Sequence, residues 1–281
     1  MNRPHRAWAL AALAGLGLVA GCTGGATATT PVGRPASSTA PAGTAPASST
    51  PAGQHSVAPA GTPLSAGQSP SAVLAAALAA LKAGPAVHVG ISSTTSQGGI
   101  TFSDDATASG GRQLISTSEG GDITILLVGG IGYVQSNVAG LVGFMQVPQS
   151  QAQSQAGRWI SLRPGDELGQ NTYDDVTDGI TLSSVATELS LAGPLKLTGP
   201  TTVAGQQALG VQGRAPASMQ LPSSARITLY VATSDARPLR YQVSGVNGYQ
   251  NQITFSDYGE SVKLAAPSGA IPASGGTPIV T

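Results

Sequence analysis

Apolar and polar residues alternate along several short stretches of the chain, and Gly, Ser and Asp separate these stretches. A period of two is typical of β-strands that bury one face. The predicted strands in the first two thirds of the chain are residues 88–92, 99–103, 112–117, 122–128, 131–135 and 159–162. Those in the last third are residues 226–232, 239–244 and 253–256. Sequential strands with one apolar face each predict an antiparallel sheet.

Two other segments have the period of an α-helix. The run PSAVLAAALAALKAG follows the capping residue Ser69 and places Leu74, Leu78 and Leu81 on one face. Residues 181–191 predict a second helix, and Gly and Pro follow it. Its inward-facing positions are Leu182, Val185 and Leu189. The order of elements therefore predicts an α+β fold in which helices cover one face of the sheet.

The first 22 residues have the organisation of an export signal. Arg3 and Arg6 precede an uncharged apolar segment at residues 7–20, which is short for a membrane span. The following VAGC ends at Cys22, the only cysteine of the chain, and resembles a bacterial lipobox. In lipoproteins the cysteine of this motif carries acyl groups such as palmitate and begins the mature chain. The resemblance implies a signal peptide at residues 1–21, a lipid anchor at Cys22 and a location on the extracytoplasmic face of the cell membrane; the alternative is a plain signal peptide.

Residues 22–68 consist almost wholly of Ala, Pro, Ser, Thr and Gly. Such a segment lacks the apolar side chains needed to offset the entropy of ordering, so we expect a disordered linker. Ser and Thr between prolines also leave O-glycosylation open. Residues 69–267 have the length of one domain, and the glycine-rich residues 268–281 are expected to form a flexible tail.

Charge is sparse, and 13 basic residues balance 13 acidic ones. The lysines and arginines are scattered, which argues against nucleic acid as a partner. Of the histidines, only His88 falls in the domain, and no cysteine accompanies it, so we expect no metal site and no cofactor. A Ser-His-Asp arrangement around His88 lacks a G-x-S-x-G motif, and we expect no catalytic residue and no enzymatic activity.

Two acidic clusters have simple structural interpretations. Asp174, Asp175 and Asp178 do not have the spacing of a calcium-binding EF-hand loop. Carboxylates are favourable at the positive end of a helix dipole, so we expect these residues at a helix start. We expect Asp104 and Asp105 to lie in a solvated turn.

The order of these segments resembles that of the LolA/LppX-like envelope lipoproteins, and in particular the actinobacterial lipid-binding lipoproteins of the LppX/LprG type. The resemblance is carried by GYV at 132–134, WISL at 159–162, and residues 203–213, 229–245 and 253–267. These are degenerate strand motifs that span most of the domain. The family implies a strongly curved antiparallel sheet, a half-barrel, with helices over its concave face and an apolar cavity between them.

The resemblance also implies a function and a site. Such proteins bind a lipid or lipoglycan in the cavity, for transport or presentation in the envelope. Carried onto this chain, the expected cavity residues are Val89, Ile91, Ile123, Ile125, Leu127, Leu229, Val231, Tyr241, Val243, Phe255, Leu78, Leu182 and Leu189. The same alternation would serve a filled core, so a structural or regulatory lipoprotein with an envelope protein partner is the alternative. A hydrolase built around His88 is a third.

Overall fold

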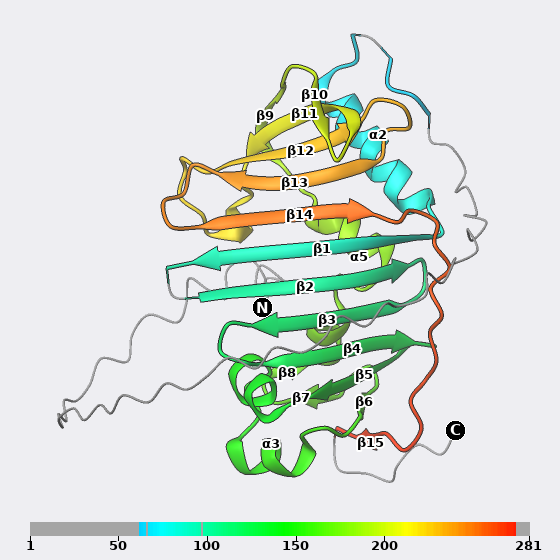
Figure 1. The fold of residues 1–281 in the computed structure, drawn as a ribbon, viewed down its shortest axis with the longest axis vertical. Helices are drawn as coiled ribbons and strands as arrows, with labels where there is room; N and C mark the ends of the chain where they lie inside the picture. Colours follow the sequence, from blue (N-terminus) through cyan, green and yellow to red (C-terminus); the bar gives the residue numbers. More distant parts are fainter. Residues whose placement is uncertain (1–61, 66, 97, 274–281) are drawn as a thin grey trace, which may run out of the picture.

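A computed structural model of the chain describes residues 62–65, 67–96 and 98–273 (Figure 1). The predicted signal peptide, Cys22 and nearly all of the predicted linker lie outside these residues. In the described part of the chain, no helix is both long and apolar enough to span a bilayer.

One 13-stranded sheet dominates the structure, and each half of the chain contributes a run of neighbouring strands (Figure 1). The first run comprises β1 (Ala86–Thr95), β2 (Gly98–Thr107), β3 (Gly111–Thr117), β4 (Asp122–Val128), β5 (Ile131–Ser136) and β6 (Ile160–Leu162). The second comprises β9 (Ala192–Leu197), β10 (Thr201–Val203), β11 (Gln206–Arg214), β12 (Arg226–Ala232), β13 (Pro238–Ser244) and β14 (Gln250–Ser256). All these strands pair antiparallel with their neighbours.

The two runs join where β14 pairs with β1. Seven residue pairs connect these strands, from His88 opposite Ser256 to Thr94 opposite Gln250. Every other neighbouring pair in the order from β10 to β6 is adjacent in sequence. The β1–β14 pairing therefore makes one continuous sheet from two meanders.

After β14 the chain runs along the ends of β1 to β5 and forms β15 (Ile271–Pro272) (Figure 1). This short strand pairs parallel with β6 at the edge of the sheet. It lies within residues 268–281, where the sequence predicts a tail, and residues 274–281 lie outside the described part. A separate two-stranded sheet is formed by β7 (Glu167–Leu168) and β8 (Asn171–Thr172).

Helices cover one face of the sheet and lie behind it in Figure 1. They are α2 (Pro70–Ala83), α4 (Tyr173–Thr177) and α5 (Leu182–Glu188). The α2 helix packs on α5 and on β9, β11, β12 and β13, whereas α5 contacts β2 and α4 contacts β4 and β5. The prediction of an α+β fold, with a curved antiparallel sheet and helices on its concave face, is confirmed.

Local sequence explains where these helices begin. The Ser69 hydroxyl accepts a hydrogen bond from the Ala72 N–H at the start of α2. Reciprocal capping pairs start the other two helices: Thr172 with Asp175 at α4, and Thr181 with Ser184 at α5. Asp174 and Asp175 thus lie in the first turn of a helix, but of α4, which the hydrophobic pattern alone did not indicate, whereas Asp178 caps the C-terminal end of that helix.

The core lies between the concave face, called here the inner face, and the helices. Alternate residues of the central strands are buried in one continuous apolar cluster. The α2 helix contributes Val73, Ala77 and Leu81, while Leu74 and Leu78 are half-buried beside them. The buried face of the helix is therefore shifted from the predicted one, of which Leu81 alone is fully buried.

One helix was not predicted, and one local prediction was wrong. The Gln-rich stretch contains α3 (Gln149–Gln155), preceded by a turn of π-helix at Gly140–Phe144, where the sequence analysis indicated no element. Asp104 and Asp105 lie within β2 rather than in a turn, and Asp104 is 1% exposed. Each has an in-register partner on β3 that a local pattern cannot reveal, Gln113 for Asp104 and Arg112 for Asp105.

Replacing Gly111 with alanine should destabilise the fold. A Cβ atom there would collide with the backbone carbonyl oxygens of Ile180 and Asp105, where β3 passes beneath the segment leading to α5. We expect Gly111→Ala to lower the free energy of unfolding by about 1–3 kcal/mol, measured by urea denaturation. Gly199→Ala is the matched control, because nothing lies near its added Cβ, and should change it by less than about 0.5 kcal/mol. Equal effects in the two variants would contradict this packing.

Candidate functional site

The residues expected to line a cavity all lie between the sheet and the helices. Every one of them except Leu78 is buried, at most 7% exposed, and all belong to or pack against the same apolar cluster. The residues selected from the sequence therefore belong to one continuous cluster of side chains. In the described structure these side chains pack against one another and against the helices.

Polar side chains are buried at several places on this apolar inner face, and two of these places bear on ligand binding. On β2 and β3, the Gln113 amide donates to the Asp104 carboxylate at 3.1 Å, and both residues are buried. On β14, Asn251 is 2% exposed, and neither its Oδ1 nor its Nδ2 has a hydrogen-bond partner in the described structure. Buried amides are normally hydrogen-bonded, so the unpaired amide of Asn251 is unusual and points to a role besides packing.

Asn251 has polar neighbours from three segments. In register it lies opposite the buried Ser93 of β1 on one side and Val243 of β13 on the other. Tyr241, two residues from Val243, donates from its hydroxyl to the Ser190 carbonyl at 3.5 Å and lies 3.9 Å from the Met219 sulfur.

Two tyrosine hydroxyls belong to this part of the interior. Burial raises the pKa of Tyr241 far above its usual range, and the nearby Glu188 carboxylate and Tyr249 raise it further. Burial also raises the pKa of Tyr249, partly offset by its hydrogen bond with Ser93. Both tyrosines therefore keep their protons at neutral pH. Ser93, Tyr241, Tyr249 and Asn251 together are called the inner polar cluster.

The sequence analysis placed Tyr241 among apolar lining residues and missed the other three. The sequence signal that could have identified Ser93 and Asn251 is a polar residue at an inward position of an alternating strand. Ser93 follows Val89 and Ile91 at a spacing of two, and Asn251 precedes Ile253 and Phe255 at the same spacing.

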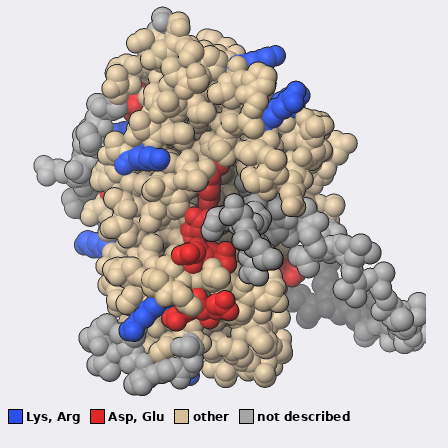
Figure 2. Space-filling view, turned by 180° about the vertical axis from the view of Figure 1, so that it is seen from behind, with Lys and Arg blue, Asp and Glu red and all other residues tan. Residues whose placement is uncertain are grey.

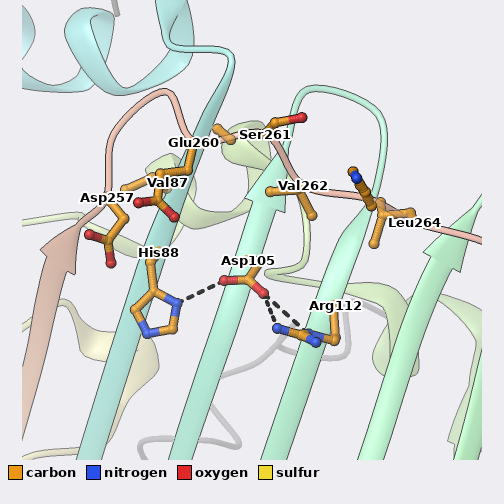
Figure 3. Close-up of a pocket in the computed structure, with 11 residues that line it drawn as sticks. Val87, His88, Asp105, Arg112, Asp257, Glu260, Ser261, Val262 and Leu264 are labelled. Carbon is orange, nitrogen blue, oxygen red and sulfur yellow. Dashed lines mark hydrogen bonds and ion pairs between the residues drawn. The ribbon is translucent and has the colours of Figure 1, made fainter. Parts of the chain in front are cut away.

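The opposite, outer face of the sheet carries a row of charged side chains across three strands (Figure 3). The Asp105 carboxylate accepts a hydrogen bond from His88 Nδ1 at 2.8 Å. Its second oxygen accepts from Arg112 Nη2 at 2.6 Å and from Nε at 3.1 Å. Burial alone would raise the pKa of Asp105, but the hydrogen bonds from His88 and Arg112 and the guanidinium charge hold it below its ordinary value.

A cavity of about 380 Å³ lies between this row and the segment at 257–264 that crosses the strand ends (Figure 3). A second cavity of about 270 Å³ shares Asp257 with it. Tyr258 lines the second cavity, with the Arg237 guanidinium 5.0 Å from its ring centre.

The chemistry of this outer row is that of an ion-paired surface. In a hydrolase, the second ring nitrogen of His88 would face a nucleophile and Asp105 would serve His88 alone. Here Asp105 also pairs with the Arg112 guanidinium. Ser256, opposite His88 in register, donates its hydroxyl hydrogen bond to Asp257. His88 is therefore a histidine whose Nδ1 is hydrogen-bonded to its neighbour Asp105.

The helical side of the molecule has a different charge. Figure 2 shows acidic side chains gathered in the middle of this face, with basic ones near its margins. Residues 164–195, which include α4 and α5, contain no Lys or Arg. Their acidic residues are Asp166, Glu167, Asp174, Asp175, Asp178 and Glu188.

Comparison with known proteins found similarity among solved structures. No protein-family model and no curated protein sequence matches the chain. The lipoprotein LppX of Mycobacterium tuberculosis is 18% identical with a TM-score of 0.44, and the match covers 70% of this chain and all of LppX. LprF of Mycobacterium bovis is 16% identical with a TM-score of 0.43, covering 74% of this chain and all of LprF. A LolA superfamily protein of Nitrosomonas europaea is 13% identical with a TM-score of 0.25, covering 70% and 96%. At these identities and TM-scores the comparisons carry no conclusion about a ligand or a role of this chain.

The ion pairs of Asp105 should make stability depend on acid pH. A carboxyl group whose pKa is lowered by folding adds stability that is present above its ordinary value of 3.8 and is lost as the pH falls through that value and below it. Wild-type protein should therefore lose more stability than Asp105→Asn between about pH 5 and pH 2, measured as urea midpoints. Arg112→Gln, which removes one partner of Asp105, should give an intermediate slope. Identical slopes for wild type and Asp105→Asn would contradict the assignment.

Proposed function

We propose that this chain is a membrane-anchored envelope lipoprotein that holds the acyl chains of a lipid or lipoglycan between its curved sheet and its helices, for transport or presentation. The observation that carries the proposal is the inner layer itself. Apolar side chains from both runs of strands form one cluster, and the helices α2, α4 and α5 cover it.

The energetics of this layer suit an acyl ligand. Burying a methylene group contributes about 0.8 kcal/mol, so two acyl chains can replace side-chain contacts without any directional bond. The covering helices α4 and α5 are 5 and 7 residues long, and helices this short depend on tertiary packing rather than on their own stability. They can move away from the sheet without breaking the ladder of strands.

The arrangement gives no support to a catalytic role. The charged row on the outer face is internally paired, and the polar groups of the inner face are an amide, hydroxyls and the Asp104–Gln113 pair. We therefore propose a binding protein and not an enzyme.

A second candidate function has an observation of its own. The expected cavity residues other than Leu78 are already buried by protein atoms, which is also what a filled core requires. A structural or regulatory lipoprotein that contacts an envelope protein would need no more than this.

Lipid extraction distinguishes the two candidates. We expect the protein, purified under native conditions as a Cys22→Ser variant, to release about one equivalent of acyl lipid into organic solvent, because the apolar layer accepts acyl chains without directional bonds. Mass spectrometry of the extract is the measurement. A clean extract, together with no binding of added dioleoylglycerol or phospholipid, would favour the filled core.

The anchor is tested separately, since Cys22 lies outside the described residues. Changing Cys22 to Ser removes the acylation site, so the protein should move from the membrane pellet to the soluble fraction and lose palmitate label. Thr23→Ser is the matched control and should stay in the pellet. Retention of Cys22→Ser in the membrane would show that something other than this cysteine holds the chain there.

A further inference from the structure

The inner polar cluster is costly for a purely structural core. An amide buried without hydrogen bonds destabilises a protein, because it loses the hydrogen bonds that it made with water in the unfolded chain. Asn251 has both of its polar atoms buried in this way, on a strand whose inward neighbours Ile253 and Phe255 are apolar. Leucine has the same branching at Cγ and would avoid the cost.

We infer that the inner polar cluster is a subsite for the uncharged polar group that joins acyl chains in an amphiphile: an ester, an amide or a hydroxyl. This inference rests on the proposed function, and it adds which chemical group of the ligand the protein recognises, and where. The amide of Asn251 supplies a donor and an acceptor on the apolar wall. Ser93, Tyr241 and Tyr249 add hydroxyls beside it.

The position of the cluster fits a group in the middle of an amphiphile rather than an exposed headgroup. Asn251 lies between β1 and β13, with the apolar Val243 and Ile253 beside it on the same face. Acyl chains bound along this wall would place their linkage, and not a methyl end, against the amide.

Charge determines which linkage can be held there. Among the described residues, no Lys or Arg is buried. The charged residue that is buried there is Asp104. The Glu188 carboxylate lies near Tyr241 on the helical side. Among the buried residues of the described structure, a phosphate would have no cation to pair with, which is strongly unfavourable.

The surrounding hydroxyls favour a neutral group over a cation as well. The two tyrosines stay protonated at neutral pH, so they and Ser93 present neutral hydroxyls. The Asp104 carboxylate on the same inner face is already bonded to Gln113. An ester carbonyl or a hydroxyl matches the donors and acceptors that remain.

The test compares three ligands with the same acyl chains. Delipidated Cys22→Ser protein is titrated with 1,2-dioleoylglycerol, with dioleoyl phosphatidic acid and with the cationic dioleoyl-trimethylammonium-propane, each displacing a fluorescent acyl probe. We expect dioleoylglycerol to bind most tightly. Asn251→Leu should weaken its binding by about three- to tenfold, the value of one or two hydrogen bonds. Gln252→Leu, the same change on the outer face of the same strand, should leave the affinity unchanged.

Stability provides the second readout. Asn251→Leu should raise the thermal midpoint of the ligand-free protein while it lowers ligand affinity, because the unpaired amide is removed. If the leucine variant does not fold, Asn251→Ala should show the same loss of affinity, because the smaller alanine side chain fits the site without a clash.

The outcomes separate this inference from the function on which it rests. Binding of none of the three ligands would overturn the proposed function. Equal or tighter binding of either charged ligand, or an Asn251→Leu protein with wild-type affinity for dioleoylglycerol, would overturn the subsite alone and leave a carrier whose inner amide is met by water.

Discussion

The fold depends on the pairing of β1 with β14. These strands are separated by more than 150 residues of chain, and every other neighbour in the order from β10 to β6 is a local meander. Without this ladder the chain would form two smaller sheets, each with an apolar face too narrow to enclose a core with α2 and α5. With it, the inner face continues from one half of the chain to the other. The polar cluster sits on this seam, since Ser93 and Asn251 are paired across it.

The period of two along each strand gives the sheet two chemistries at once. Asp104 and Asp105 are adjacent in sequence, yet one is hydrogen-bonded to Gln113 inside the core and the other joins His88 and Arg112 outside. The outer row needs no ligand because its charges satisfy one another. Asn251 on the inner face has no such arrangement. This contrast is why the inner face, and not the larger outer cavity, is the better candidate for binding.

The sequence predicted the elements that depend on local patterns. The bounds of β4 and β12 agree with the alternating runs, and α2 begins after Ser69 as the capping signal indicated. The inward direction of the expected cavity residues also followed from alternation alone. The class of fold could be predicted for this reason, with the family resemblance supplying its curvature.

The remaining features depend on contacts between distant segments. Gln149–Gln155 is helical although no apolar period marks it, and Ala152 is the residue that it buries. The buried residues of α2 are Val73, Ala77 and Leu81 rather than the predicted Leu74, Leu78 and Leu81, because packing on α5 and the neighbouring strands sets the rotation of the helix. Asn251 and Ser93 lie in short polar runs that are typical of exposed segments. Only the pairing of β1 with β14 buries them.

The end of the chain after β14 has a consequence for how copies of this molecule meet. β15 covers the open edge of β6, and its second residue, Pro272, has no N–H group to donate. An exposed strand edge is a template on which another chain can add. In the proposed anchored state, copies would be concentrated in the plane of a membrane, where encounters between them are frequent. A two-residue strand that ends the hydrogen-bonding pattern at this edge keeps the sheet within one molecule.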